Sequence, residues 1–346
     1  MKKRSLFIVL VMTVAMAPAF AATYYWTNAA GGNDFSVLGN WNTKADGSGS
    51  IAADLADDTL VINKSGAANA VLSGTLANNP ANVQVATTDN ATGELIISGG
   101  THNITNTLRA AISKTTTTGY VTISGGTINV LNSYTTFGDT GAAFVAMSGG
   151  ILNTDRVTFG QTATSACTLD MTGGTMNITI SDATAAATSG ALRMGLGNTQ
   201  LNLSGSAQIN AQKLSLLQGG SLNMNGGTVN ILGITPNGIP AGIDYSLVDL
   251  NTFDFTADSL ALGQVLGKIQ FNAGQFLVAG DYSTLLDAAI ASGNIYTSVA
   301  GKSVDAQYAD GYTSLVLVPE PATLMLLTLG GVILRRQKAR NYTQRV

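Results

Sequence analysis

Hydrophobic and polar residues alternate with a period of two through the middle of the chain, a pattern typical of β-strands. Two such alternating segments are joined by a Gly-Gly pair, with an Asn within the second segment, and together they form a ten-residue unit that recurs along this region. The copies begin at Leu95, Val121, Val145, Leu169, Leu201 and Leu222. Their first glycines are separated by 26, 24, 24, 32 and 21 residues, and the fifth copy is degraded because Ser206 replaces its second glycine. Repetition at so short a period predicts a solenoid in which successive repeats stack.

A shorter element lies between the copies, with a Phe or Met followed by a Gly, as at Phe137, Phe159 and Met194. We expect this side chain to fill the interior at the next corner. About 24 residues with three strands and tight turns suit one coil of a parallel β-helix, with neighbouring coils about 4.8 Å apart. The predicted fold is therefore all-β, a right-handed parallel β-helix. A β-sandwich or propeller is the alternative, but it predicts repeats of about 40 residues or more.

The Asn of the repeat is predicted to stack as an amide ladder, each side chain bonding to the coils above and below. The residues concerned are Asn103, Asn129, Asn153, Asn177 and Asn230. Such neutral ladders explain why only 11% of residues are charged, because a stack would place like charges next to each other on every coil.

The repeats occupy residues 95–232. The segment before them, residues 22–94, contains both tryptophans, Trp26 and Trp41. We expect this segment to form an aromatic N-terminal cap with incomplete first coils, because an uncovered strand edge would template aggregation.

Residues 233–317 follow the repeats and are predicted to form a small mixed C-terminal cap. Strands are expected at 245–250, 268–278 and 314–317, with a helix over 281–290 that starts at a capping Asp281.

The formal net charge of −3 hides an uneven distribution. Residues 1–22 carry +3, 318–346 carry +4, and the stretch between them carries −10. An acidic body argues against nucleic acid as a partner, since nucleic-acid binding needs a positive face on the folded domain. The two basic ends indicate membrane-handling signals instead.

Residues 1–21 have the parts of a secretory signal peptide, namely a basic start, an apolar stretch from Leu6 to Met16, and small residues at Ala19 and Ala21. We expect cleavage before Ala22, which makes the Sec machinery and signal peptidase expected partners. An uncleaved anchor is the alternative, and the shortness of the apolar run disfavours it.

Residues 318–346 have three parts in a fixed order: Pro319, Glu320 and Pro321, then an apolar run over 322–334, then a basic end that begins with Arg335 and Arg336. The 13 apolar residues would form a helix of about 20 Å, short of the ~30 Å hydrocarbon core. With the basic end on the cytoplasmic side, this short transmembrane helix would hold an exported chain in the inner membrane.

This tail resembles the PEP-CTERM sorting signal of Gram-negative bacteria, although ten residues after Arg336 make its basic end longer than usual. The resemblance implies that an exosortase, a membrane cysteine transpeptidase, recognises and cleaves the tail. The body would then pass from a transient inner-membrane anchor to the cell surface or extracellular matrix. A plain C-terminal anchor is the alternative. With its repeats and aromatic start, the chain resembles β-helical PEP-CTERM surface proteins, and similar coils occur in autotransporter passengers.

Candidate catalytic and metal-binding residues are few. Within the repeats the acids are Asp139, Asp155, Asp170 and Asp182, and none recurs at equivalent positions of successive Gly-Gly units. We interpret Asp155 and Arg156 as a solvated turn pair. Polysaccharide-acting β-helices need clustered carboxylates, so we predict no catalytic site.

The other reactive residues also favour structural roles. Cys167 and His102 are the only residues of their kinds, and we expect a small packed side chain and an outlier of a first coil, respectively. We interpret Asp54, Asp57 and Asp58 as a solvated acidic loop, because the Gly-Asp repeat of calcium-binding rolls is absent. The sequence therefore predicts no metal site and no cofactor.

The predicted function is that of an exported, exosortase-sorted structural or adhesive protein of the surface or matrix, non-enzymatic and associated with exopolysaccharide. A secreted β-helical polysaccharide lyase or hydrolase is the alternative.

Overall fold

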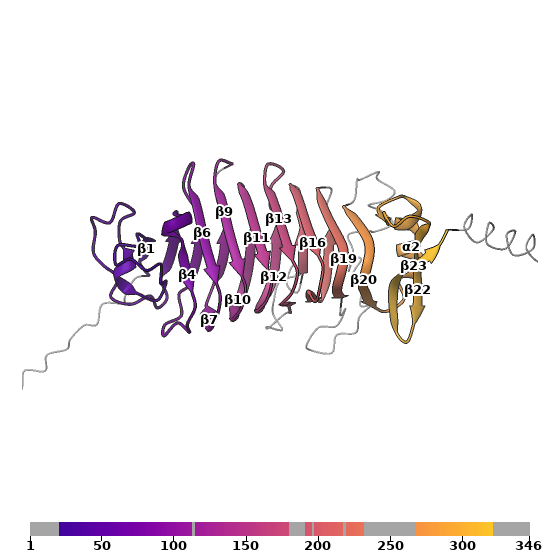
Figure 1. Ribbon diagram of the computed structural model, residues 1–346, viewed down its shortest axis with the longest axis horizontal. Helices are drawn as coiled ribbons and strands as arrows, with labels where there is room; N and C mark the ends of the chain where they lie inside the picture. The colour runs from indigo at the N-terminus through magenta and orange to yellow at the C-terminus, as the bar shows by residue number, and fades with distance from the viewer. Residues whose placement is uncertain are drawn as a thin grey trace, which may run out of the picture.

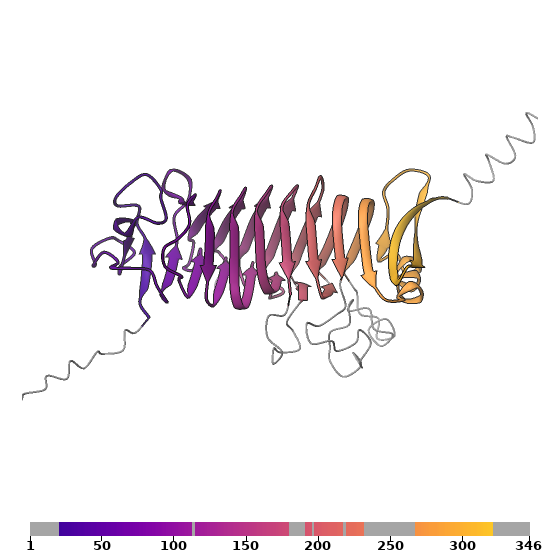
Figure 2. The same ribbon diagram turned by 90° about the horizontal axis from the view of Figure 1, so that it is seen from below.

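The computed structural model describes residues 21–112, 115–179, 191–195, 197–216, 219–231 and 267–320. In these ranges strands are the main regular structure, beside one short α-helix and two single-turn 3₁₀ helices, which confirms the all-β class. The strands form an elongated stack with a looped N-terminal cap at one end and a hairpin with a short helix at the other (Figures 1 and 2). Within the repeats, strands pair in parallel with their equivalents one repeat earlier and one repeat later, so they form three rows along the stack.

The first row contains the strands that precede the Gly-Gly turns. Its members are β4 (Ala70–Leu72), β6 (Thr92–Ile97), β9 (Thr118–Ile123), β11 (Ala142–Met147), β13 (Ala166–Met171), β16 (Asn198–Leu203), the starts of β19 (Gly220–Ile231) and β20 (Lys268–Ala279), and β21 (Ile295–Tyr296). Alternate side chains of this row point inward: Leu95 and Ile97 are buried, whereas Ile96 is half-buried and Ser98 is exposed. The period of two in the sequence thus divides core from surface.

The second row follows the Gly-Gly turns. It contains β7 (Thr101–Ile104), the starts of β10 (Thr127–Phe137) and β12 (Ile151–Phe159), β14 (Thr175–Ile178), β17 (Gln208–Ala211) and the ends of β19 and β20. This row carries the Asn positions, which are in register from coil to coil.

The third row closes each coil. It contains β1 (Thr23–Trp26), β3 (Thr59–Ile62), β5 (Asn82–Val85), β8 (Thr107–Ala110), the ends of β10 and β12, β15 (Ala191–Met194) and β18 (Lys213–Leu216). Phe137, Phe159 and Met194 are in register here and fully buried, and the two Phe rings stack with centroids 5.7 Å apart. The predicted filling of this corner by an aromatic or Met side chain is confirmed.

The glycine pair turns the chain between the first and second rows for two separate reasons. Gly126 has a φ of +76°, a conformation that L side chains avoid. A Cβ on Gly125 would lie 2.5 Å from the Ser98 carbonyl oxygen of the previous coil. In the degraded copy, where Ser206 replaces the second glycine, the positive φ moves to Gly205 at +59°. The turn therefore needs both conformational freedom and close approach of backbones.

The predicted amide ladder is confirmed, and it is longer than the five residues first identified. Five bonds of 2.8–2.9 Å connect successive coils, because each Asn donates its Nδ2 to the Oδ1 of the previous one. The ladder runs through Asn103, Asn129, Asn153, Asn177, Asn210 and Asn230. Asn210 belongs to the degraded copy, so this copy keeps its amide although it has lost a glycine.

The aromatic N-terminal cap is also present. Trp26, Phe35 and Trp41 are buried together, and the Trp41 ring centroid lies 5.2 Å from that of Trp26 and 4.7 Å from that of Phe35. Each indole N–H donates to a backbone carbonyl, that of Trp41 to Phe35 and that of Trp26 to Ala68, both at 2.8 Å. Short elements complete this cap: β2 (Trp41–Asn42) and two single-turn 3₁₀ helices, Leu38–Asn40 and Gly66–Ala68.

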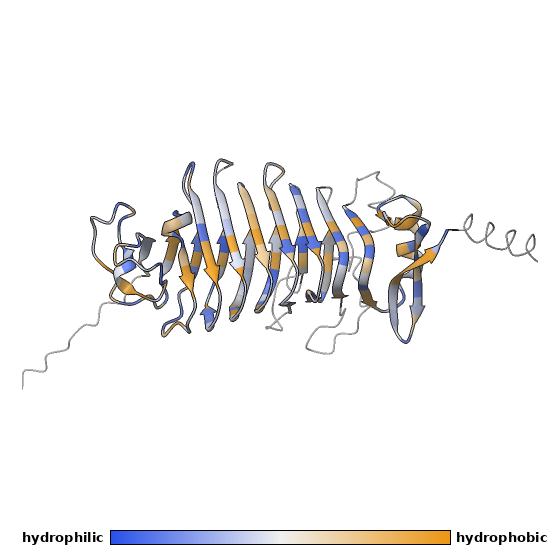
Figure 3. Ribbon diagram, in the orientation of Figure 1, coloured by the Kyte–Doolittle hydropathy of each residue, from blue (hydrophilic) through white to orange (hydrophobic). Residues whose placement is uncertain are grey.

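The parallel rows continue past the last Gly-Gly unit. The helix α2 (Ser283–Ala291) follows β20; it starts two residues and ends one residue later than predicted, and its N-cap is Tyr282 rather than Asp281. An antiparallel hairpin of β22 (Lys302–Ala309) and β23 (Tyr312–Pro319) completes this end. Orange and blue segments alternate along the stacked strands in Figure 3, as the buried and exposed positions do. The strand predicted over 245–250 lies outside the described residues.

Two interpretations from the sequence are wrong. Asp155 and Arg156 are not a solvated turn pair, because both lie inside β12, with Asp155 buried and the Arg156 guanidinium over the Tyr134 ring, 4.7 Å from its centroid. Asp58 is not a solvated loop residue either: it is 7% exposed, although Asp54 and Asp57 are exposed as expected.

Candidate functional site

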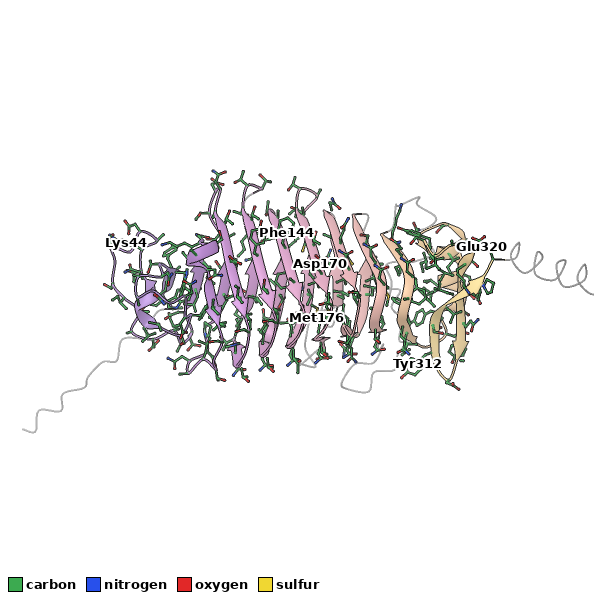
Figure 4. All side chains as sticks on the ribbon, viewed as in Figure 1. Lys44, Phe144, Asp170, Met176, Tyr312 and Glu320 are labelled. Carbon is green, nitrogen blue, oxygen red and sulfur yellow. The ribbon has the colours of Figure 1, made fainter. Side chains whose placement is uncertain are left out.

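The C-terminal hairpin carries the start of the predicted sorting signal to the end of the stack. Asp310 and Gly311 form its tight turn with φ of +53° and +83°, the geometry that an Asp-Gly pair favours between antiparallel strands. β23 then runs along both β22 and β20. Tyr312 and Glu320 mark the two ends of this last segment in Figure 4.

Pro319 and Glu320 are exposed at the point where the hairpin ends. Pro319 lies opposite Lys302, and the Glu320 N–H donates to the Gly301 carbonyl at 3.1 Å. The backbone of the motif is thus hydrogen-bonded to the body up to Glu320. Pro321, Arg335 and Arg336 lie outside the described residues, as does the apolar run over 322–334.

The first described residues, Ala21 and Ala22, lie at the opposite end of the stack from the C-terminal hairpin (Figure 1). Ala21 is exposed and Ala22 is half-buried, immediately before β1, whereas Ala19 and the rest of the leader are outside the described residues. Within the described ranges no helix has both the length and the apolar character needed to cross a membrane.

The outer surface of the first row carries an aromatic pair. Tyr120 and Phe144 occupy equivalent positions of β9 and β11, are 39% and 44% exposed, and stack with ring centroids 5.3 Å apart. The next residue in this column is the smaller Thr168, and a shallow hollow of about 140 Å³ opens beside the rings.

Two carboxylates line the same hollow. Glu94 precedes Tyr120 in the column, and its Oε2 accepts a hydrogen bond from the Gly66 N–H at 2.8 Å. Asp170 lies one column away and accepts from Asn202 Nδ2 at 2.7 Å. Phe144 and Asp170 lie on the same face in Figure 4. The hollow therefore combines aromatic carbon with hydrogen-bond acceptors and carries negative charge.

The other acids of the repeats are dispersed. Asp139 follows β10 and forms an ion pair with Arg109 of β8, 30 residues earlier, a contact that the repeat pattern does not predict. Asp155 is inside β12, and Asp182 is outside the described residues. The structure does not bring three or more His, Cys, Asp or Glu side chains of the described ranges together at a metal-binding distance.

His102 and Cys167 both lie in the interior. His102 is in register with Ile128, its Nε2–H donates to the Gly99 carbonyl at 2.7 Å, and its buried Nδ1 has no partner. Burial lowers the pKa of His102 and raises the pKa of the Cys167 thiol. Cys167 is thus the small packed side chain that was expected, and an ionised thiolate is strongly disfavoured there.

Comparison with known proteins decides the nature of the C-terminal segment. Residues 317–338 match the family model of the PEP-CTERM protein-sorting motif. The chain carries a PEP-CTERM sorting motif. The motif supports an exported, surface-directed protein that is sorted by an exosortase, and it includes Pro319, Glu320, Pro321, Arg335 and Arg336. No curated protein and no solved structure matches the chain.

Proposed function

We propose that this PEP-CTERM protein is a non-enzymatic structural or adhesive component of the cell surface or extracellular matrix. One observation carries the proposal: the sorting motif begins in the last three residues of β23, the last strand of the body, which ends at an exposed extremity of the stack. Backbone bonds of the described body reach Glu320, so an exosortase acting beyond this residue leaves the stack intact.

The leader and the tail have consecutive roles in this proposal. Signal peptidase removes residues 1–21 during Sec-dependent export, while the apolar run over 322–334 holds the chain transiently in the inner membrane. Arg335 and Arg336 keep the end of the tail on the cytoplasmic side until the exosortase releases the body.

We assign the body to the right-handed parallel β-helix architecture. Three parallel rows with repeats of about 24 residues support this assignment, and right-handed crossovers are the general rule for parallel strands. Neutral ladders along the rows suit an extracellular role, because they depend little on pH or ionic strength.

An association with exopolysaccharide is the second part of the proposal. Exposed aromatic rings pack against the C–H faces of sugars, and the carboxylates of Glu94 and Asp170 accept hydrogen bonds from hydroxyls. The net charge of −10 over residues 23–317 disfavours anionic glycans, so a neutral polysaccharide is the expected ligand.

The experiment is localisation of the full-length chain in an exosortase-positive Gram-negative host. Deletion of residues 319–340 is expected to keep the protein from the surface, whereas an Asp310→Asn variant, altered nearby but outside the motif, should be sorted normally. Unchanged surface display of the deletion variant would contradict the sorting role. Release of reducing ends or unsaturated sugars from polysaccharides by the purified protein would instead support a lyase or hydrolase.

A further inference from the structure

The first described residues are bound to a buried acid. The Ala22 backbone nitrogen donates to Asp58 Oδ1 at 2.6 Å, and the Ala22 carbonyl accepts from the Thr59 N–H at 2.9 Å. Thr23 then pairs with Thr59 as the parallel ladder between β1 and β3 begins. Ala22 is thus fixed at the edge of the third row by contacts on both sides of its Cα.

The negative charge of the Asp58 carboxylate is only partly balanced while its partner, the Ala22 nitrogen, belongs to an uncharged peptide bond. It is 7% exposed, and its backbone carbonyl is held by the N–H groups of Ala81 and Asn82 in the next coil, so the residue cannot readily turn outward. Burial raises the pKa of Asp58, the neighbouring acids Asp54 and Asp57 raise it further, and the bond from Ala22 opposes them. A buried carboxylate in this setting favours a cationic partner.

Signal-peptide removal would supply that cation. Water adds across the Ala21–Ala22 amide, the C–N bond breaks, Ala21 leaves with the leader as a carboxylate, and the Ala22 nitrogen is released as an amine that takes up a proton. We propose that the new α-ammonium of Ala22 pairs with the Asp58 carboxylate, so that export processing itself completes and locks the N-terminal cap. This rests on the Sec-dependent export of the proposed function and goes beyond it.

The register of the structure makes the pairing specific to one cleavage position. Ala21 is exposed, which suits the last residue of a leaving leader, whereas the nitrogen on Asp58 belongs to Ala22. Cleavage one residue later would remove Ala22 together with its two hydrogen bonds. Cleavage one residue earlier would place the charge on the exposed Ala21.

The test uses the processed protein purified from the secreting host. Terminal sequencing identifies the first residue, and the pH dependence of α-amine acylation gives the amine's pKa. We expect Ala22 as the first residue and a pKa at least one unit above the ordinary 7.7–8.0, which makes acylation near pH 7 about tenfold slower. In urea the same protein should return to the ordinary value.

Two variants make the result specific. Asp58→Asn keeps a hydrogen-bond acceptor and removes the charge, so its amine should titrate normally in the folded protein. Asp57→Asn removes a charge from the adjacent exposed residue and should leave the raised pKa in place. Equal pKa values in wild type and Asp58→Asn, or an ordinary value in the folded wild type, would overturn the pairing.

The outcomes separate this inference from the proposed function. A surface-displayed protein that begins at a residue other than Ala22 overturns the pairing and leaves the sorting role standing. A chain that keeps its leader and stays in the cytoplasm overturns both.

Discussion

Asn153 donates its Nδ2 to Asn129 Oδ1 at 2.8 Å and accepts a bond of 2.9 Å from Asn177, so one half-buried amide joins three successive coils. Asn153→Ala removes both bonds and leaves one donor and one acceptor of the neighbouring amides unpaired. We expect the free energy of unfolding to fall by about 1–3 kcal/mol, at about 0.5–1.5 kcal/mol per bond. Urea denaturation measures it, and Ser148→Ala, an exposed position of the same coil, is the matched control.

Gly126 tests the turn between the first and second rows. Gly126→Ala forces an L side chain into a φ of +76° and places its Cβ 2.6 Å from the Gly99 carbonyl oxygen. The left-handed conformation alone costs about 1–2 kcal/mol, and the contact with the previous coil adds to it. Gly74→Ala, whose Cβ meets nothing within 4 Å, should unfold like the wild type. Similar losses in both variants would contradict this explanation of the turn.

His102 gives the body a pH dependence in the mildly acidic range. Burial lowers its pKa below that of the unfolded chain, about 6.5, so its protonation favours unfolding. Stability should therefore be complete above about pH 6.5 and decline as the pH falls through and below that value. Thermal unfolding between pH 5 and pH 8 measures the effect.

Replacement of His102 should remove this component of the pH dependence. Ile128 occupies the equivalent position of the next coil, so His102→Ile retains a side chain that suits the column and eliminates the unpartnered Nδ1. We expect the variant to match or exceed wild-type stability at pH 8, by up to about 1 kcal/mol, and to exceed it more at pH 5. A variant with the wild-type pH profile would show that another group is responsible.

The aromatic hollow predicts a polysaccharide-binding face. Phe144→Ala removes one of the two stacked rings, and we expect binding of a neutral polysaccharide to weaken by about two- to tenfold, since an aromatic contact is worth about 0.5–1.5 kcal/mol. Tyr308→Ala removes a 50% exposed ring from β22 in the terminal hairpin and is the matched control. Affinity electrophoresis in polysaccharide gels compares the three proteins.

Much of the fold can be predicted from local sequence pattern, because each repeat contains the residues that determine its own strands and turn. The repeat places equivalent positions of successive coils in register. Examples are the buried Leu95 and Ile97, the positive φ of Gly126 and the stacked Asn residues. The sorting tail can also be recognised from the sequence, because its three parts follow one another along the chain.

Features that depend on register between unlike segments could not be predicted. Arg109 and Asp139 are 30 residues apart in the chain, and they form an ion pair only because β8 and β10 are neighbours in the third row. Asp58 resembled a loop residue because the sequence does not reveal that the chain at Ala22 covers it. Asp155 lies opposite the register shift between Val130 and Tyr134, and its burial there depends on how the two strands pair, which the local sequence around Asp155 does not show.

Mass spectrometry of the C-terminus of the surface-released protein tests the central claim most directly. We expect a mature chain that retains β23 and ends in or just after Pro319–Pro321, with the apolar run and Arg335–Arg336 removed, and only in cells that have an exosortase. Surface protein that still ends at Val346 in such cells would contradict it.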